Sequence, residues 1–249
     1  MKLSGPAAAL LLLAGACMPR VSSAAEADPA RGELSARPQA TIVTPGALGL
    51  SEIDLGGRQP ALLYVPEQYD AEELTALVVM LHGAGGRPDA TLELVREHAD
   101  EMGFIVLAPS SRASSWDVIA ERRYGPDVLA LDEGLRQAFA AFSIDPQRVA
   151  IAGFSDGASY ALSLGLGNGE LFSHIVAFSP GFIAPARQRG APDIFISHGE
   201  DDTVLPIDRC SRTIVPQLET AGYSVDYREF PGGHMVPGDL ARAAFSALD

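Results

Sequence analysis

The sequence predicts an α/β fold: a single domain on a mostly parallel central sheet of about eight strands, with helices on both faces. Two observations support this prediction. Apolar runs of strand length alternate with amphipathic stretches of helix length, which is the order that a parallel sheet with crossover helices requires. The 249 residues are 47% hydrophobic and 20% charged, which suits one domain with a sizeable core.

The elements follow one another from about residue 48. Strands are expected over residues 52–55, 61–65, 77–82, 104–108, 149–153, 175–179, 194–198 and 224–230, and helices over 90–102, 126–142, 157–166, 210–221 and 238–248. Gly56 and Gly57 separate the first two strands, which are therefore expected to form an antiparallel hairpin. The strand over 149–153 lies mid-sheet, so ligands should gather at its carboxyl end.

The N-terminus is typical of an export leader. Lys2 supplies a charge, residues 7–16 form an apolar run too short to span a bilayer comfortably, and small residues before Ala24 and Ala27 fit a cleavage site. We expect a signal peptide over 1–24 and a periplasmic or secreted protein, with a buried helix or a membrane anchor as the alternative. Residues 13–17 (LAGAC) resemble a lipobox, so lipidation at Cys17 would give a membrane anchor.

Residues 25–46 are rich in Ala, Pro, Glu and Arg without apolar periodicity. They predict an exposed linker, and the folded domain is expected over 47–249. Within that domain Cys210 has no partner cysteine, so no disulfide framework is expected and Cys210 is interpreted as a small buried hydrophobe.

The charged residues exclude several functions. The formal net charge of -14 argues against nucleic acid as a partner, because binding to phosphates requires clustered Lys and Arg. Lys2 is the only lysine, so a chain without its leader has none. This excludes Schiff-base chemistry and a Ser-Lys dyad, and a serine nucleophile would need a histidine base.

Residues 153–157 (GFSDG) match the G-x-S-x-G nucleophile elbow, which holds a serine on a sharp turn between a strand and a helix. The expected strand before the motif and helix after it are the context that the motif requires. The glycines at 153 and 157 are expected because a Cβ there would strike the neighbouring strand or helix. Ser155 is therefore the candidate nucleophile, and the alternative is an ordinary helix N-cap.

A serine nucleophile needs a base and an acid that orients the base. His234 follows the last expected strand in a loop with two glycines, and Asp202 follows the strand over 194–198. The order Ser155, Asp202, His234 is the order that the elbow-containing fold uses. His234 as a surface histidine, Asp201 as the acid, and a solvated turn or cation site over residues 200–202 remain alternatives.

The oxyanion formed by serine attack needs backbone N–H donors. One is expected from Asp156, which follows the serine, and the other from Ala84 in the glycine-rich residues 81–86 (LHGAGG) after the third strand. A phosphate-binding loop is the alternative, but the segment lacks the lysine of a P-loop.

Together the segments 81–83 (LHG), 153–157, 198–206 (HGEDDTVLP) and 233–234 (GH) resemble the phospholipase/carboxylesterase branch of the α/β-hydrolases over about residues 61–248. In that family the fifth position of the HGxxD pattern holds the triad acid, so the resemblance implies Asp202 rather than Asp201. Leu205 and Ala158 depart from the residues usual there. Secreted depolymerases and feruloyl esterases share these motifs, so the resemblance implies an ester substrate without selecting one.

The pocket is expected to be open. Only residues 180–193 separate two expected strands where a lid is usually inserted, which is too short for a cap domain. Trp116, the only tryptophan, follows the fourth strand and is a candidate for the substrate pocket, with packing away from the site as the alternative.

We therefore expect a carboxylic-ester hydrolase that acts through an acyl-enzyme on a small-molecule or polymer-borne ester, without a cofactor or metal ion. The alternatives are a lysophospholipase or thioesterase, a polyester depolymerase, a peptidase, and a non-catalytic binding protein on the same scaffold.

Overall fold

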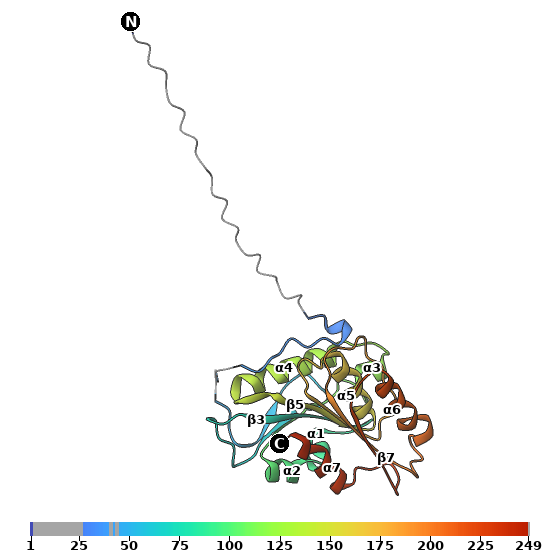
Figure 1. Cartoon of the computed structure of the whole chain (residues 1–249). Helices are drawn as coiled ribbons and strands as arrows, with labels where there is room; N and C mark the ends of the chain where they lie inside the picture. Colours follow the sequence, from blue (N-terminus) through green and yellow to red (C-terminus); the bar gives the residue numbers. More distant parts are fainter. Residues whose placement is uncertain (2–26, 40–41, 43–44, 249) are drawn as a thin grey trace.

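The computed structural model describes residue 1, residues 27–39, residue 42 and residues 45–248 (Figure 1). Residues 2–24 of the predicted signal peptide, with Cys17, lie outside these residues. Within them, no helix combines the length and the apolar character needed to cross a membrane.

An eight-stranded sheet forms the centre of the molecule, in the order β1-β2-β4-β3-β5-β6-β7-β8. β1 and β2 form the expected antiparallel hairpin, β2 pairs antiparallel with β4, and the remaining neighbours are parallel. The strands are β1 Gly49–Ile53, β2 Ala61–Val65, β3 Thr75–Leu81, β4 Ile105–Ala108, β5 Ile144–Phe154, β6 His174–Phe178, β7 Asp193–Gly199 and β8 Val225–Phe230. The mostly parallel sheet confirms the predicted fold class.

The helices of the described residues are α1 Pro88–Glu93, α2 Arg96–Met102, α3 Asp117–Ala120, α4 Pro126–Ala141, α5 Asp156–Gly167, α6 Ser211–Thr220 and α7 Gly238–Phe245. Short 3-10 turns occur at Pro29–Arg31, Ile207–Arg209 and Ser246–Leu248. The helix expected over 90–102 is divided, because Val95 leaves helical geometry at φ -129° and ψ -11°. The sequence missed α3, whose four residues are too few to carry a helical period.

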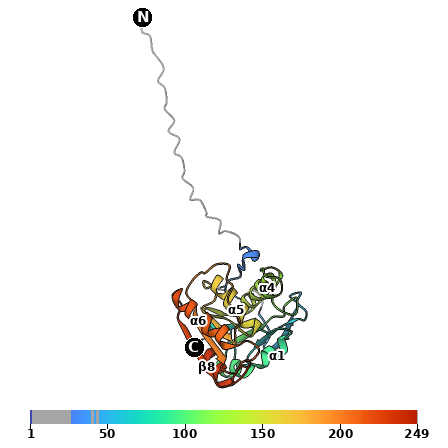
Figure 2. The same cartoon turned by 90° about the vertical axis from the view of Figure 1, so that its right-hand side faces the viewer.

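Side chains alternate along β3, and each set joins a different core. Leu77, Val79 and Leu81 pack with α4, α5 and α6, while Val78 and Met80 pack with α1, α2 and α7. Both views show α4 and α5 on one side of the sheet and α1 on the other (Figures 1 and 2). Burial on both faces explains why the central strands are continuous apolar runs.

Residues 27–39 differ from the exposed linker that we expected. Leu34 and Ala36 are buried, at 3% and 5% exposure. The Leu34 N–H donates to Asn168 Oδ1 at 2.9 Å, and the N–H groups of Ser35 and Ala36 donate to Asp132 Oδ1 at 2.7 and 2.8 Å. The segment is therefore packed onto the domain, because side chains distant in sequence satisfy its backbone donors.

Candidate active site

Ser155 lies on the turn between β5 and α5, at the carboxyl edge of the sheet. Its φ of 57° and ψ of -119° are unusual for a residue with a side chain, and strain of this kind costs about 1–3 kcal/mol. A Cβ on Gly153 would lie 2.3 Å from the carbonyl of Gly157, and a Cβ on Gly157 would lie 2.2 Å from Leu81 O. Both glycines are required because backbone passes directly against them.

Three side chains from different loops form one hydrogen-bonded chain at this edge. His234 Nε2 lies 2.9 Å from Ser155 Oγ, and His234 Nδ1 lies 2.6 Å from Asp202 Oδ2. Asp202 follows β7, His234 follows β8, and Ser155 follows β5. Parallel strands bring the three loops together although Ser155 and His234 are 79 positions apart.

Asp202 is surrounded by hydrogen-bond donors. The N–H groups of Val204 and Leu205 donate to its Oδ1 at 2.9 and 2.8 Å. Burial alone would raise the pKa of Asp202, but the Leu205 N–H, His234 and the Val204 N–H together hold it below its usual value, so the group is a carboxylate. Asp201 is exposed, and it is Asp202 whose carboxylate reaches His234.

His198, the first residue of the HGxxD pattern, is a second histidine beside Asp202. It is fully buried, and its Nε2 lies 2.8 Å from Leu205 O and 3.2 Å from Asp202 Oδ2. Two acceptors face Nε2, so this nitrogen carries the proton, and Nδ1 accepts from the Ser211 hydroxyl at 2.7 Å. Burial lowers the pKa of His198, so the ring is neutral and donates toward the carboxylate. Its place as the histidine of the HGxxD pattern was the feature of the sequence that could have indicated this role.

The loop after β3 passes next to Ser155. A Cβ on Gly83 would lie 3.2 Å from Ser155 Cβ, and Ala84 is exposed at this edge. His82 is buried beneath the loop, where its Nε2 accepts from the Ser111 N–H at 3.0 Å and its Nδ1 lies 2.8 Å from Gly83 O. The Asp156 N–H is in the first turn of α5, where helix donors lack intrahelical partners. Gly83, next to Ala84, and Asp156 thus lie on either side of Ser155.

Trp116 does not line an open pocket. Its side chain is 1% exposed, and its Nε1 donates to His82 O at 2.9 Å. The indole stacks on Tyr160 of α5 with ring centroids 5.2 Å apart. The structure therefore buries Trp116 next to the Ser155 turn, so that it packs beside the site and exposes almost none of its surface to a substrate.

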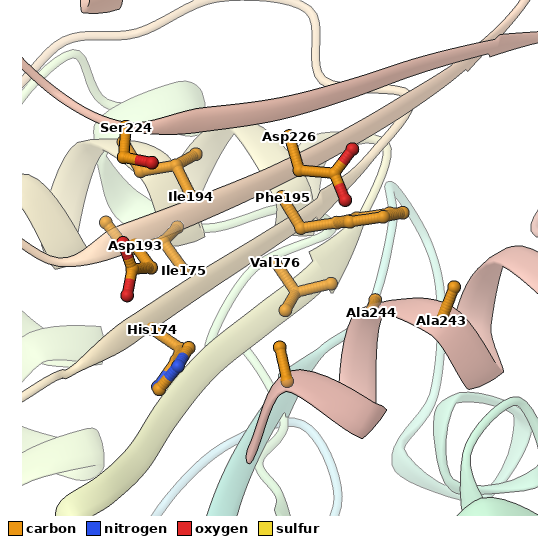
Figure 3. Close-up of a pocket in the computed structure, with 11 residues that line it drawn as sticks. His174, Ile175, Val176, Asp193, Ile194, Phe195, Ser224, Asp226, Ala243 and Ala244 are labelled. Atoms are coloured by element: carbon orange, nitrogen blue, oxygen red, sulfur yellow. The ribbon is translucent and has the colours of Figure 1, made fainter. Parts of the chain in front are cut away.

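A separate cavity lies at the opposite edge of the sheet, where β6, β7 and β8 begin (Figure 3). His174 and Asp193 lie on one side of it and Phe195 and Asp226 on the other, with α7 across from the strands. Parallel strands carry the chain from this edge toward Ser155. The cavity is thus not part of the Ser155 site. Across the described ranges, no group of three or more His, Cys, Asp or Glu is arranged to hold a metal ion.

A family model described as phospholipase/carboxylesterase matches residues 128–246, just under half of the chain. The curated relatives include an acetylxylan esterase of Coprinopsis cinerea, 28% identical over 44% of this chain and 32% of that protein. An acyl-protein thioesterase 1 of Gibberella zeae is 26% identical over 68% of this chain and 88% of that protein. A probable feruloyl esterase C of Aspergillus clavatus is 27% identical over 63% and 58%. The match thus spans about a third of the acetylxylan esterase and just over half of the feruloyl esterase.

Solved structures show the same fold. A phospholipase/carboxylesterase from Dyadobacter fermentans superposes with a TM-score of 0.56 at 23% identity, over 81% of this chain and 98% of that chain. An esterase named PE8 superposes with a TM-score of 0.60 at 23% identity, over the same shares. The eight-stranded sheet thus has the α/β-hydrolase fold of these solved structures, and over residues 128–246 the chain is similar to the phospholipase/carboxylesterase family.

Proposed function

We propose that the protein hydrolyses carboxylic esters through a Ser155–His234–Asp202 catalytic triad. The observation that carries the proposal is the unbroken hydrogen-bonded chain from Ser155 Oγ through His234 to the Asp202 carboxylate, which begins on a strained turn. A serine hydroxyl is a weak nucleophile until an adjacent base accepts its proton. With no lysine other than Lys2, the chain relies on histidine for that base.

In the first half of the reaction Ser155 Oγ attacks the carbonyl carbon and its proton passes to His234 Nε2. The tetrahedral intermediate collapses, the ester C–O bond breaks, and His234 gives the proton to the departing alcohol. Asp202 holds Nδ1–H and stabilises the positive imidazolium that exists between these steps. The product of this half is an alcohol and an acyl group on Ser155.

In the second half water attacks the acyl-enzyme, and His234 accepts a proton from that water. The intermediate then releases the carboxylic acid, and Ser155 Oγ recovers its proton from His234. In both halves the negative oxygen would lie between the N–H groups of Ala84 and Asp156, and the positive end of the α5 dipole favours the same charge.

The substrate we propose is a small or polymer-borne ester with an apolar acyl or aryl group. Residues 179–192, between β6 and β7, contain no helix, so this connection forms no cap domain over the site. Val204 and Met235 follow closely after Asp202 and His234, and both are exposed, at 64% and 51%. Apolar side chains at the rim of an open site favour contact with an apolar part of a substrate.

Thioester hydrolysis is the second candidate, because the acyl-protein thioesterase relative matches over 88% of its own length. Parallel rates on p-nitrophenyl esters of graded chain length, a feruloyl ester, a polyester film, a lysophospholipid and an acyl thioester would separate these substrates. Equal or higher kcat/KM on the thioester would overturn the preference for oxygen esters.

The test of the triad is Ser155→Ala, with Ser246→Ala as the exposed serine control. We expect Ser155→Ala to lose hydrolysis of p-nitrophenyl butyrate and labelling by a fluorophosphonate probe, while the control keeps both. Hydrolysis at the wild-type rate by folded Ser155→Ala would refute the proposal. Absence of labelling and hydrolysis in the wild type would favour a non-catalytic binding protein.

We also propose export to the periplasm or the medium, on the strength of residues 1–24. Cell fractionation of the full chain and of Cys17→Ala tests this: retention in the cytoplasm refutes export, and release from membranes only in the variant indicates lipidation.

A further inference from the structure

Three consecutive residues of the loop after β4 contact both sides of the Ser155 turn. Ser114 O accepts the Gly85 N–H at 2.6 Å, and the Ser115 hydroxyl donates to Asp156 Oδ2 at 2.5 Å. Trp116 Nε1 donates to His82 O at 2.9 Å. One short segment thus holds the loop after β3 and the start of α5.

The first side contains Ala84, one of the two proposed oxyanion donors. The bonds at His82 O and Gly85 N bracket this residue, two positions before it and one after it. An N–H group can stabilise an oxyanion only if it already points to where the charge develops. The loop closes its own turn through the Gly86 N–H, which donates to Gly83 O at 3.0 Å, and the bonds from Ser114 and Trp116 fix that turn relative to the rest of the domain.

The second side contains Asp156, the other proposed donor. Its N–H would face the oxyanion, but its carboxylate is a negative charge on the same residue. A negative side chain free to approach the oxyanion would oppose the reaction by Coulomb repulsion. The buried Ser115 hydroxyl instead holds this carboxylate by a charge-assisted hydrogen bond.

The indole of Trp116 connects the two sides mechanically. The ring centroids of Trp116 and His82 lie 4.7 Å apart. The ring of Tyr160, on α5, stacks on the indole with centroids 5.2 Å apart and an angle of 14° between the ring planes. Trp116 and Tyr160 are both among the largest fully buried side chains. In such a close-packed interior, a shift of the Trp116 ring would displace the side chains packed against it.

We propose that Ser115 and Trp116 are positioning residues that set the geometry of both oxyanion donors, Ala84 and Asp156. The inference rests on the proposed function, since it requires an oxyanion at Ser155. Neither side chain contacts the reacting atoms, and each acts through the donor it holds.

Two variants remove the bonds, although Trp116→Phe also removes part of the buried volume of the indole. Trp116→Phe retains an aromatic ring between His82 and Tyr160 but lacks the indole N–H, and Ser115→Ala lacks the hydroxyl. Ser115→Thr keeps a hydroxyl and is the rescue variant. Tyr124→Phe is the matched control, because it removes another buried aromatic donor, which bonds to Ala184 O at 3.1 Å.

The readout separates positioning from general damage. Loss of an oxyanion donor costs about 10²–10³ in kcat, and a displaced donor should cost at least about tenfold. We expect Trp116→Phe and Ser115→Ala to lower kcat for p-nitrophenyl butyrate by about tenfold or more with KM within about twofold. Affinity for an alkyl trifluoromethyl ketone, whose serine adduct carries an oxyanion, should fall by a similar factor. Ser115→Thr should restore both values, and Tyr124→Phe should change neither.

Each outcome decides the proposal. Unchanged kcat and inhibitor affinity in both variants, with Ser155→Ala inactive, would overturn the positioning role and leave the triad intact. Equal losses in Tyr124→Phe, or a rise in KM without a fall in kcat, would assign the effect to general packing. Full activity of Ser155→Ala would overturn the triad and the positioning role together.

Discussion

Replacing Asp202 by Asn tests the orientation of His234 most directly. Asp202 Oδ1 accepts from two backbone N–H groups, while Oδ2 receives His234 Nδ1 and lies 3.2 Å from His198 Nε2. These four polar partners of the carboxylate are all donors. An amide has only one acceptor oxygen, so one set of donors must face an NH₂ group.

The backbone bonds favour keeping the amide oxygen on the Val204 and Leu205 side. The NH₂ group of the substituted side chain would then face His234 Nδ1, which could only accept, and the ring proton would move to Nε2. In that tautomer Nε2 cannot accept the proton of Ser155. Loss of the orienting acid in serine proteases lowers kcat by about 10⁴, or roughly 5.5 kcal/mol, and we expect a fall of about 10³–10⁴ here.

Asp201→Asn is the matched control, because it makes the same change at the adjacent exposed position. Initial rates on p-nitrophenyl butyrate and rates of fluorophosphonate labelling should fall together in Asp202→Asn and stay near the wild-type rate in Asp201→Asn. Thermal unfolding would verify that both variants are folded. Less than a tenfold loss in Asp202→Asn, or a larger loss in Asp201→Asn, would refute the assignment of Asp202.

Two further predictions concern stability. Burial raises the pKa of Asp127 to about 6, so between about pH 4 and 6 the folded chain binds a proton more readily than the unfolded chain. This stability contribution, on the order of 1–3 kcal/mol, is present below about pH 4 and is lost as the pH rises through 6. Urea unfolding of wild type and Asp127→Asn over this range should therefore differ in slope, and parallel curves would contradict the reasoning. Asp132→Ala removes the acceptor of the Ser35 and Ala36 N–H groups, so it should lower the free energy of unfolding by about 1–3 kcal/mol and speed proteolysis near residue 35. Glu133→Ala, the control, should do neither. Equal stability of the two variants would mean that the N-terminal segment contributes nothing to stability.

Sequence periodicity alone predicted most of the architecture. Strand and helix patterns depend on residues close together in the chain, and the strands end within about two residues of their expected carboxyl ends. The β5 strand begins at Ile144, earlier than expected. The sequence did not predict this start because the first residues of the strand are not a continuous apolar run. The GFSDG motif by itself predicted that positions 153 and 157 must be glycine, and the close backbone contacts at Gly153 and Gly157 give the steric reason.

Contacts between distant segments were decided only by the tertiary structure. The sequence left Asp201 and Asp202 as alternatives on residue pattern alone, and the turn after β7 buries one carboxylate against His234 and exposes the other. Burial of residues 34 and 36 depends on Asp132 and Asn168, about a hundred or more positions away. Such partners leave no local period in the sequence, because their energy comes from groups that meet only after the chain has folded.

Trp116 illustrates the same division. Its position after the fourth strand made it a candidate for the substrate pocket, with packing away from the site as the alternative, and the structure places it beside the Ser155 turn but buried. Whether the ring faces solvent or core depends on the space between His82 and Tyr160, which side-chain packing in three dimensions creates. The sequence by itself thus determined the order of the elements and the chemistry available at their ends. The tertiary structure decided which of those groups touch, because each contact joins loops that only the assembled sheet brings together.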